Sequence, residues 1–118
     1  MLNVETIRTY CLERRGATEG FPFGEDTLVF KVGGKMFALM SLVSGDRVNL
    51  KCDPEYALEL REQHEHAILP GWHMNKQHWN TVVFSEGLSE KLVLSLIDHS
   101  YDLIVGSLTK KKREELGE

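Results

Sequence analysis

The stretch from Trp72 to Asn80 has the richest concentration of functional side chains in the chain. It reads WHMNKQHWN and holds two indoles, two imidazoles, two asparagines, a glutamine and a lysine. Such groups donate hydrogen bonds and offer rings for stacking, and binding residues often lie on loops. The alternative is structural: the tryptophans pack at the rim of a core, and the asparagines satisfy the backbone of turns. Both interpretations stay open at this point.

A second polar group comes from the alternating run RVNLKC at 47–52. Because successive side chains of a strand point to opposite faces, one face is apolar and the other holds Arg47, Asn49 and Lys51. The same argument adds three residues from neighbouring runs: Lys31, Trp79 and Thr81. Cations for phosphates, an asparagine for a base edge and an indole for stacking are the parts of a nucleic-acid site. The alternative is a solvated sheet face with a tryptophan at its margin.

Patterns typical of metal sites and enzymes are missing from the sequence. His64 and His66 lack the helical spacing of a zinc motif, and no pair of cysteines completes a tetrahedral set. Asp98, His99 and Ser100 are adjacent, so on a helix they point about 100° apart and cannot form a catalytic triad. No phosphate-binding loop is present. We therefore expect a protein that is not an enzyme and that needs no metal and no cofactor.

Length and charge limit the remaining classes. The 118 residues are enough for one hydrophobic core, and 42% hydrophobic with 27% charged residues is typical of globular proteins. The net charge of -4 means that any nucleic-acid surface has to be a local patch. Cys11 and Cys52 have no redox or metal spacing. Because no leader and no apolar run of bilayer length is apparent, we expect a cytoplasmic protein without a membrane partner.

The pattern predicts helices and strands that alternate in small groups. Helices are expected at 4–14, after Asp53-Pro54 as far as His64, and from Ser89 over four to five turns. Strands are expected at 27–32 and 35–42, joined by a Gly-Gly turn, and at 47–52 and 79–84, with a loop and a short strand before the last. The expected fold class is α+β, a two-layer antiparallel β-sheet with helices packed on one face. Residues 1–113 form one domain, and 114–118 are a frayed tail.

Four phrases in this order and spacing resemble the MmcQ/YjbR family of small bacterial proteins: FPFGEDTLVFKVGGKMFAL, VNLKCDP, GWHMNKQHWNTV and LIDHSYDLIV. The resemblance covers residues 3–113 and implies a CyaY-like fold, similar to that of bacterial frataxin. It also implies DNA binding through a double-wing arrangement of strands and hairpins. Carried over by position, it points to the following residues: Lys51, Asn75, Lys76, His78, Trp79 and Asn80.

The first hypothesis is therefore a DNA-binding protein in which Arg47, Lys51 and Lys76 hold phosphates and Trp79 stacks or wedges. The candidate binding residues are Arg47, Asn49, Lys51, His73, Asn75, Lys76, His78, Trp79 and Asn80. The alternative hypothesis is a small-ligand or protein-interaction module without nucleic-acid binding, in which the segment 72–80 recognises the partner. A concave pocket lined by these residues would favour the alternative. We expect a monomer, with at most a weak dimer.

Overall fold

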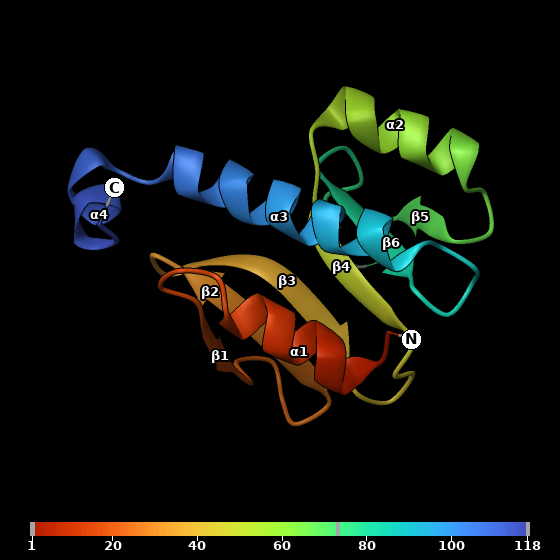
Figure 1. Cartoon of the computed structure of the whole chain (residues 1–118), viewed down its shortest axis with the longest axis horizontal. Coiled ribbons are helices and arrows are strands. Elements are labelled where there is room, and N and C mark those ends of the chain that lie inside the picture. The colour runs from red at the N-terminus through yellow and green to blue at the C-terminus, as the bar shows by residue number, and fades with distance from the viewer. Residues whose placement is uncertain (1, 73, 118) are drawn as a thin grey trace.

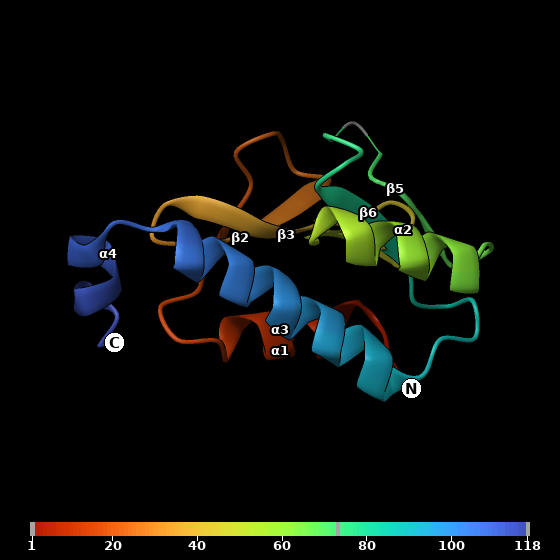
Figure 2. The same ribbon diagram turned by 90° about the horizontal axis from the view of Figure 1, so that it is seen from above.

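The computed structural model describes residues 2–72 and 74–117. Within them, six strands form one antiparallel sheet in the order β1-β2-β3-β4-β6-β5. The strands are β1 (Thr18–Gly20), β2 (Thr27–Val32), β3 (Lys35–Ser41), β4 (Arg47–Lys51), β5 (Ile68–Pro70) and β6 (Trp79–Val83). The helices are α1 (Val4–Leu12), α2 (Pro54–Gln63), α3 (Glu90–Ser107) and α4 (Lys110–Glu115). Helices α1 and α3 cover one side of the sheet (Figures 1 and 2), so the predicted α+β class is confirmed.

Helices α1, α2 and α3 each begin directly after a residue whose side chain caps them. The side chains of Asn3, Asp53 and Ser89 each accept a hydrogen bond from the backbone N–H three residues later. Such caps satisfy N–H groups that have no partner inside the helix. The first helix ends at Leu12, two residues before its predicted end.

The main core lies between the sheet and helices α1 and α3. Burying large apolar side chains of this kind contributes about 1.5 to 3 kcal/mol each. The main core includes Ile7, Cys11, Leu28, Phe30, Met40, Val48, Leu50, Val82, Leu96, Ile97 and Ile104. We call this side of the sheet the inner face and the opposite side the outer face.

A buried serine on α3 joins the helix to the middle of the sheet. The register of β2 and β3 shifts between Phe30 and Lys31, which leaves Phe37 outside the pairing. The hydroxyl of Ser100 donates a 2.5 Å hydrogen bond to the carbonyl of Phe37 and accepts one of 2.9 Å from the N–H of Lys51. Because the serine is completely buried, it satisfies two backbone groups that water does not reach.

The neighbours of Ser100 on α3 also have structural partners. Asp98 accepts hydrogen bonds from Tyr10 in α1, at 2.7 Å, and from Arg14 just after α1, at 2.6 Å. His99 accepts one of 3.1 Å from the N–H of Asp53, at the start of α2. The Asp-His-Ser sequence therefore points in three directions and ties α3 to three other parts of the fold.

The C-terminal end differs from the predicted frayed tail. Residues Lys110–Glu115 form α4, and the Thr109 side chain caps this helix by accepting from the N–H of Lys112. Leu116 packs on Gly16, where a side chain would collide with it, and joins the margin of the main core. The prediction missed this contact because the two residues lie at opposite ends of the sequence. No helix in residues 2–72 and 74–117 has the length and hydropathy needed to cross a membrane.

Candidate ligand-binding site

The outer face holds the side chains that strand alternation predicts. In the register of β4 and β6, Asn49 lies opposite Thr81 and Lys51 lies opposite Trp79. Their neighbours Leu50 and Val82 belong to the inner core, so these four side chains lie on the outer face, as Arg47 does at the start of β4. The predicted shared face of 47, 49, 51, 79 and 81 is confirmed.

The centre of the outer face, however, is apolar. Val29, Leu39 and Trp79 form a second buried cluster, and Met36 and Met74 pack against it. The expectation of a polar, basic surface is therefore wrong for this region. One reason is that β2 and β3 carry apolar side chains on both faces. The other is that the loop between β5 and β6 packs Met74 against the apolar cluster on the outer face. Trp79 is only 9% exposed and packs in this cluster.

A three-residue network fixes the start of this loop over the sheet. The hydroxyl of Thr81 donates to Oδ1 of Asn49 at 2.6 Å and accepts from the backbone N–H of Trp72 at 3.0 Å. Nδ2 of Asn49 donates to the carbonyl of Trp72 at 3.3 Å. Both backbone groups of Trp72 are thus bound by side chains of β4 and β6. We call Asn49, Thr81 and the Trp72 backbone the loop clamp.

Arg61 of α2 holds the other end of the loop. Its Nε donates to Oδ1 of Asn80 at 2.7 Å, and its Nη2 donates to the carbonyls of Lys76 and Trp79. Asn80 is only 2% exposed and belongs to the inner face, whereas Asn49 belongs to the outer face. These two asparagines of the predicted site therefore lie on opposite sides of the sheet.

The remaining predicted residues lie along the loop itself. Oδ1 of Asn75 accepts a hydrogen bond from the N–H of Gln77 at 2.9 Å. This is an Asx turn, in which the asparagine satisfies the backbone of the loop, as the structural alternative predicts. Nζ of Lys76 donates to the carbonyl of Gly71 at 3.4 Å. The side chain of His78 is exposed, and its carbonyl accepts from the N–H of Cys52. His73 lies outside the described residues.

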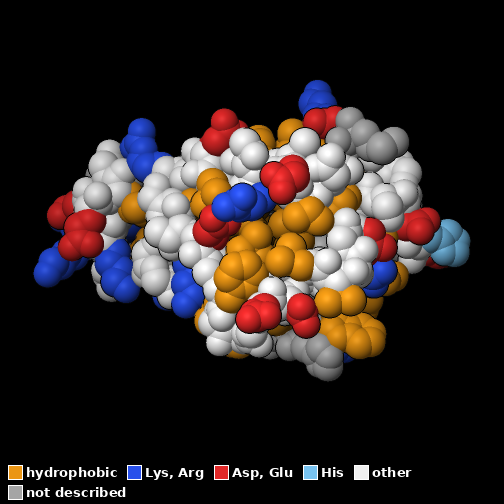
Figure 3. Space-filling view, turned by 90° about the horizontal axis from the view of Figure 1, so that it is seen from below, with side chains coloured by type: hydrophobic (Ala, Val, Ile, Leu, Met, Phe, Trp, Pro, Cys, Tyr) orange, Lys and Arg blue, Asp and Glu red, His pale blue; other side chains and the backbone are white. Residues whose placement is uncertain are grey.

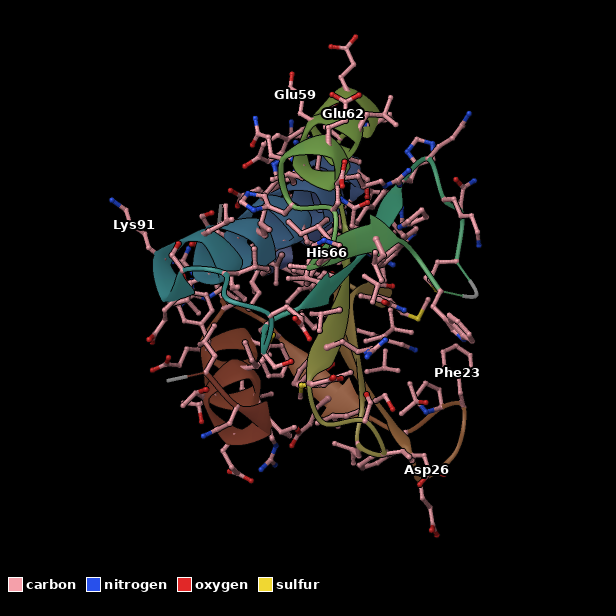
Figure 4. The ribbon with its side chains drawn as sticks, turned by 90° about the vertical axis from the view of Figure 1, so that its right-hand side faces the viewer. Phe23, Asp26, Glu59, Glu62, His66 and Lys91 are labelled. Carbon is pink, nitrogen blue, oxygen red and sulfur yellow. The ribbon has the colours of Figure 1, made fainter. Side chains whose placement is uncertain are left out.

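A cavity of about 590 Å³ opens on the outer face between two loops. Its walls include Phe23, from the loop after β1, and Trp72, which are 64% and 68% exposed. Figure 4 shows the Phe23 ring directed toward the loop between β5 and β6, whereas Asp26 points into solvent. The other residues that line the cavity are Thr27, Met36, Leu39, Ser41, Ser44, Arg47, Asn49 and Met74.

Arg47 and Asn49 belong to the candidate binding residues, and Trp72 and Met74 lie in the predicted segment 72–80, whereas the other apolar lining residues were not predicted. Residue type alone does not distinguish Met36 and Leu39 from core residues, because they sit in a continuous apolar run. Phe23 had one available signal: it lies in the turn-prone stretch FPFGED, and loops run over the surface and often carry binding residues.

Arg47 is the charged group of the cavity. Its Nε and Nη2 donate to the two carboxylate oxygens of Asp46, at 2.8 and 3.2 Å. This hydrogen bonding lowers the pKa of Asp46 and raises the pKa of Arg47, and the charge of Glu86 raises the Arg47 pKa further. Within the described ranges, Nη1 of Arg47 has no hydrogen-bond partner.

The two thiols lie on the other side of the sheet, in the main core. Burial raises the pKa of Cys11 to about 12 and that of Cys52 to about 11. Thiols with such pKa values are protonated at neutral pH and are poor nucleophiles. Among residues 2–72 and 74–117, no group of three or more His, Cys, Asp and Glu side chains could hold a metal ion.

The view from below shows how polar and apolar side chains are distributed on one side (Figure 3). Hydrophobic side chains lie between acidic ones in the middle, and Lys and Arg gather toward the end that carries α4. The loops after β1 and β3, which lie lowest in Figure 1, carry four exposed hydrophobic residues: Phe21, Phe23, Leu42 and Val43.

The fold and the site define a class: an α+β protein with helices on one face of an antiparallel sheet and an apolar cavity on the other. The YjbR family model matches residues 12–103, and the chain belongs to this family, as its motifs indicate. It is 41% identical over 113 residues to protein YbdF of Escherichia coli O157:H7, with 95% of this chain and 92% of that protein covered. It is 32% identical over 116 residues to protein YjbR of Escherichia coli K12, with 98% of each covered.

Two solved structures show the same fold. The crystal structure of Deinococcus radiodurans protein DR2400 aligns with a TM-score of 0.92 and 41% identity, over 99% of this chain and 89% of that one. The crystal structure of a protein from Pseudomonas syringae aligns with a TM-score of 0.75 and 27% identity, over 87% of this chain and 99% of that one.

Proposed function

We propose that this chain is a non-enzymatic binding protein that takes up a small, mostly apolar molecule in the cavity between Phe23 and Trp72. The observation that carries the proposal is the cavity itself. Its volume of about 590 Å³ lies within the range of about 300 to 1,000 Å³ that is typical of small-molecule sites. An apolar floor with a few polar groups at one side is also the usual composition of such sites.

The exposed rings give a source of binding free energy. Phe23 and Trp72 leave about two thirds of their surface in water, at 64% and 68%. Covering apolar surface contributes about 25 cal/mol for each Å² removed from water. A ligand that lies between these rings and on Met36 and Leu39 buries apolar surface on several sides.

The cavity is also largely preformed, which lowers the entropic cost of binding. Leu39 and Asn49 belong to strands of the sheet, and the loop clamp holds the backbone of Trp72 to that sheet. The sheet and the Trp72 backbone are therefore in place before a ligand enters.

The methionines provide a direct test. Met36 and Met74 line the cavity, whereas Met40 is fully buried in the inner core and serves as an internal control. In a ¹³C-methyl methionine spectrum of the protein titrated with indole, we expect the Met36 and Met74 signals to move and the Met40 signal to stay.

Two variants show where indole binds. Ser44→Phe, at the cavity wall, should weaken the shift changes of Met36 and Met74, and Ser85→Phe, in the exposed turn after β6, should not. Unmoved Met36 and Met74 signals at millimolar indole would refute the proposal.

DNA binding by the same face is the second candidate. It is favoured by Lys31 and Lys51, which lie on the outer face and make no ion pair with any residue in the described ranges. Trp72 then replaces Trp79 as the stacking ring, because its side chain is exposed.

Fluorescence anisotropy with labelled single- and double-stranded oligonucleotides tests this candidate. Each contact with a phosphate should make the affinity fall with salt, so Lys31→Gln and Lys51→Gln should weaken binding and flatten the salt dependence. Lys91→Gln is the matched control, because Lys91 lies on α3 and points away from the Phe23 side of the molecule (Figure 4). Absence of binding at low salt excludes the candidate.

A further inference from the structure

Two side chains that line the cavity, Asn49 and Arg47, keep N–H groups that only an acceptor atom can satisfy. Oδ1 of Asn49 already accepts from Thr81, while Nδ2 carries two hydrogens and donates one to Trp72. Ser41 accepts from the N–H of Ser44 and keeps its own hydroxyl hydrogen. Nη1 of Arg47 adds two more donors. A ligand that satisfies this surface has to bring acceptor atoms.

Arg47 indicates what kind of acceptor fits. One edge of its guanidinium already binds a carboxylate, that of Asp46, through two hydrogen bonds. Guanidinium and carboxylate groups have matching planar shapes, so charge-assisted pairs of this type are strong. Nη1, at the end of the guanidinium, remains for a second carboxylate, which has to compete with the negative charges of Asp46 and Glu86.

We propose that the ligand of the cavity is an apolar or aromatic carboxylic acid, with its carboxylate on Nη1 of Arg47 and its apolar body between Phe23 and Trp72. This inference rests on the proposed function, because it names the chemical class of the molecule bound at that site. The apolar body lies on Met36 and Leu39, and the amide of Asn49 is a further donor within the same cavity. An ammonium group cannot take the place of the carboxylate, because it has no acceptor atom for Nη1 of Arg47.

Three probes that share one apolar body test the inference: 3-phenylpropionate, 3-phenylpropanamide and 3-phenylpropylammonium. Dissociation constants come from the shifts of the Met36 and Met74 methyl signals. We expect the carboxylate to bind about fivefold to tenfold more tightly than the amide, and the ammonium to bind most weakly. The amide keeps an acceptor oxygen without the charge, so the ratio of its dissociation constant to that of the carboxylate gives the effect of the charge.

Substitutions at the neighbouring positions 46 and 47 should act in opposite directions. Arg47→Gln should remove the preference for the carboxylate over the amide, and Arg47→Lys should keep part of it, because lysine retains the charge without the planar geometry. Asp46→Asn should strengthen carboxylate binding by about twofold to fivefold, because it removes a competing negative charge from a partly exposed site. A purely structural role of the Asp46–Arg47 pair would not produce a gain in affinity. An unchanged Met40 signal in each variant shows that the inner core is intact.

The outcomes separate this inference from the proposed function. If all three probes shift Met36 and Met74 with equal dissociation constants, or if the ammonium binds most tightly, the carboxylate inference is wrong and the cavity remains a binding site. The same holds if Arg47→Gln keeps the preference for 3-phenylpropionate. If no probe shifts these methyl groups but indole does, the carboxylate inference alone fails; if indole does not shift them either, the proposed function fails as well.

Discussion

The hydroxyl of Thr81 on β6 lies 2.6 Å from Oδ1 of Asn49 on β4 and donates a hydrogen bond to it. The same hydroxyl accepts from the N–H of Trp72, whose carbonyl binds the Asn49 amide. Two neighbouring strands thereby hold the loop that carries Trp72 and Met74 over the apolar part of the outer face. The shape of the cavity depends on this contact.

Replacing Thr81 by valine should loosen the loop while keeping the shape of the side chain. The substitution leaves the Trp72 N–H and Oδ1 of Asn49 without their partner, so we expect a loss of about 1 to 3 kcal/mol in the free energy of unfolding. Hydrogen exchange at the Trp72 amide should accelerate. Thr18→Val, on the exposed edge strand β1, is the control and should change the stability by no more than about 0.5 kcal/mol. Unchanged exchange at Trp72 would show that the clamp does not hold the loop.

Gly71 is expected to tolerate no side chain. A Cβ atom at this position would lie 2.7 Å from the Trp79 Cβ and 2.9 Å from the Trp79 carbonyl oxygen, where the two backbones approach closely. Gly71→Ala should therefore reduce the free energy of unfolding by about 1 to 3 kcal/mol in urea denaturation. Gly106→Ala, in the last turn of α3 with open space around it, should instead raise it by up to about 1 kcal/mol. Equal effects of the two substitutions would contradict this packing.

Ser100 is predicted to stabilise the junction of α3 with β3 and β4. Ser100→Ala leaves the Phe37 carbonyl and the Lys51 N–H without a partner in a buried place, which should cost about 2 to 4 kcal/mol of unfolding free energy. Ser95→Ala, on the same helix but exposed, should change it by no more than about 0.5 kcal/mol. Thermal or urea unfolding of both variants measures these changes. If Ser100→Ala lowers the free energy of unfolding no more than Ser95→Ala, Ser100 does not stabilise the junction.

The buried thiols should make the protein less stable in alkaline solution. Burial raises the pKa of Cys11 to about 12 and of Cys52 to about 11, whereas thiols of an unfolded chain ionise near about 8.5. Above that pH the folded state binds more protons than the unfolded state, so the thiol contribution is complete below about pH 8.5 and is lost as the pH rises toward 11 and 12.

Urea denaturation between pH 8 and 10 measures this effect. The slope of stability against pH should approach at most about 1.4 kcal/mol per pH unit for each thiol. It should be flatter in a Cys11→Ala, Cys52→Ala double variant, with a remaining part from Tyr10, whose pKa is raised by burial and by its hydrogen bond to Asp98. An identical slope in the double variant would contradict the assignment to the thiols.

Much of the fold could be predicted from local signals. The caps at Asn3 and Asp53 and the Gly33-Gly34 turn lie directly beside the helices and strands that they delimit, so short windows of sequence reveal them. The two short edge strands are harder, because β1 and β5 have three residues each and gain their order from pairing. The packing of Leu116 on Gly16 depends on contacts between the two ends of the chain, which no local pattern shows.

The site was only partly predictable for a related reason. Alternation correctly places Arg47, Asn49 and Lys51 on one face, because a regular strand has a period of two. It does not reveal that Leu39 makes the same face apolar, since β3 is hydrophobic on both sides and its register shifts beside Phe37. Nor does it reveal that the loop folds back over this face, because the loop clamp joins residues from separate parts of the sequence.

The central claim is that a small apolar molecule binds in the cavity on the outer face. Intermolecular nuclear Overhauser effects from 3-phenylpropionate test it most directly, because they report which protein protons lie beside the ring. The predicted result is a set of contacts to the methyl groups of Met36, Leu39 and Met74, with none to Met40. Contacts to Met40, or no contacts at a probe concentration that saturates any shift changes, would contradict the account.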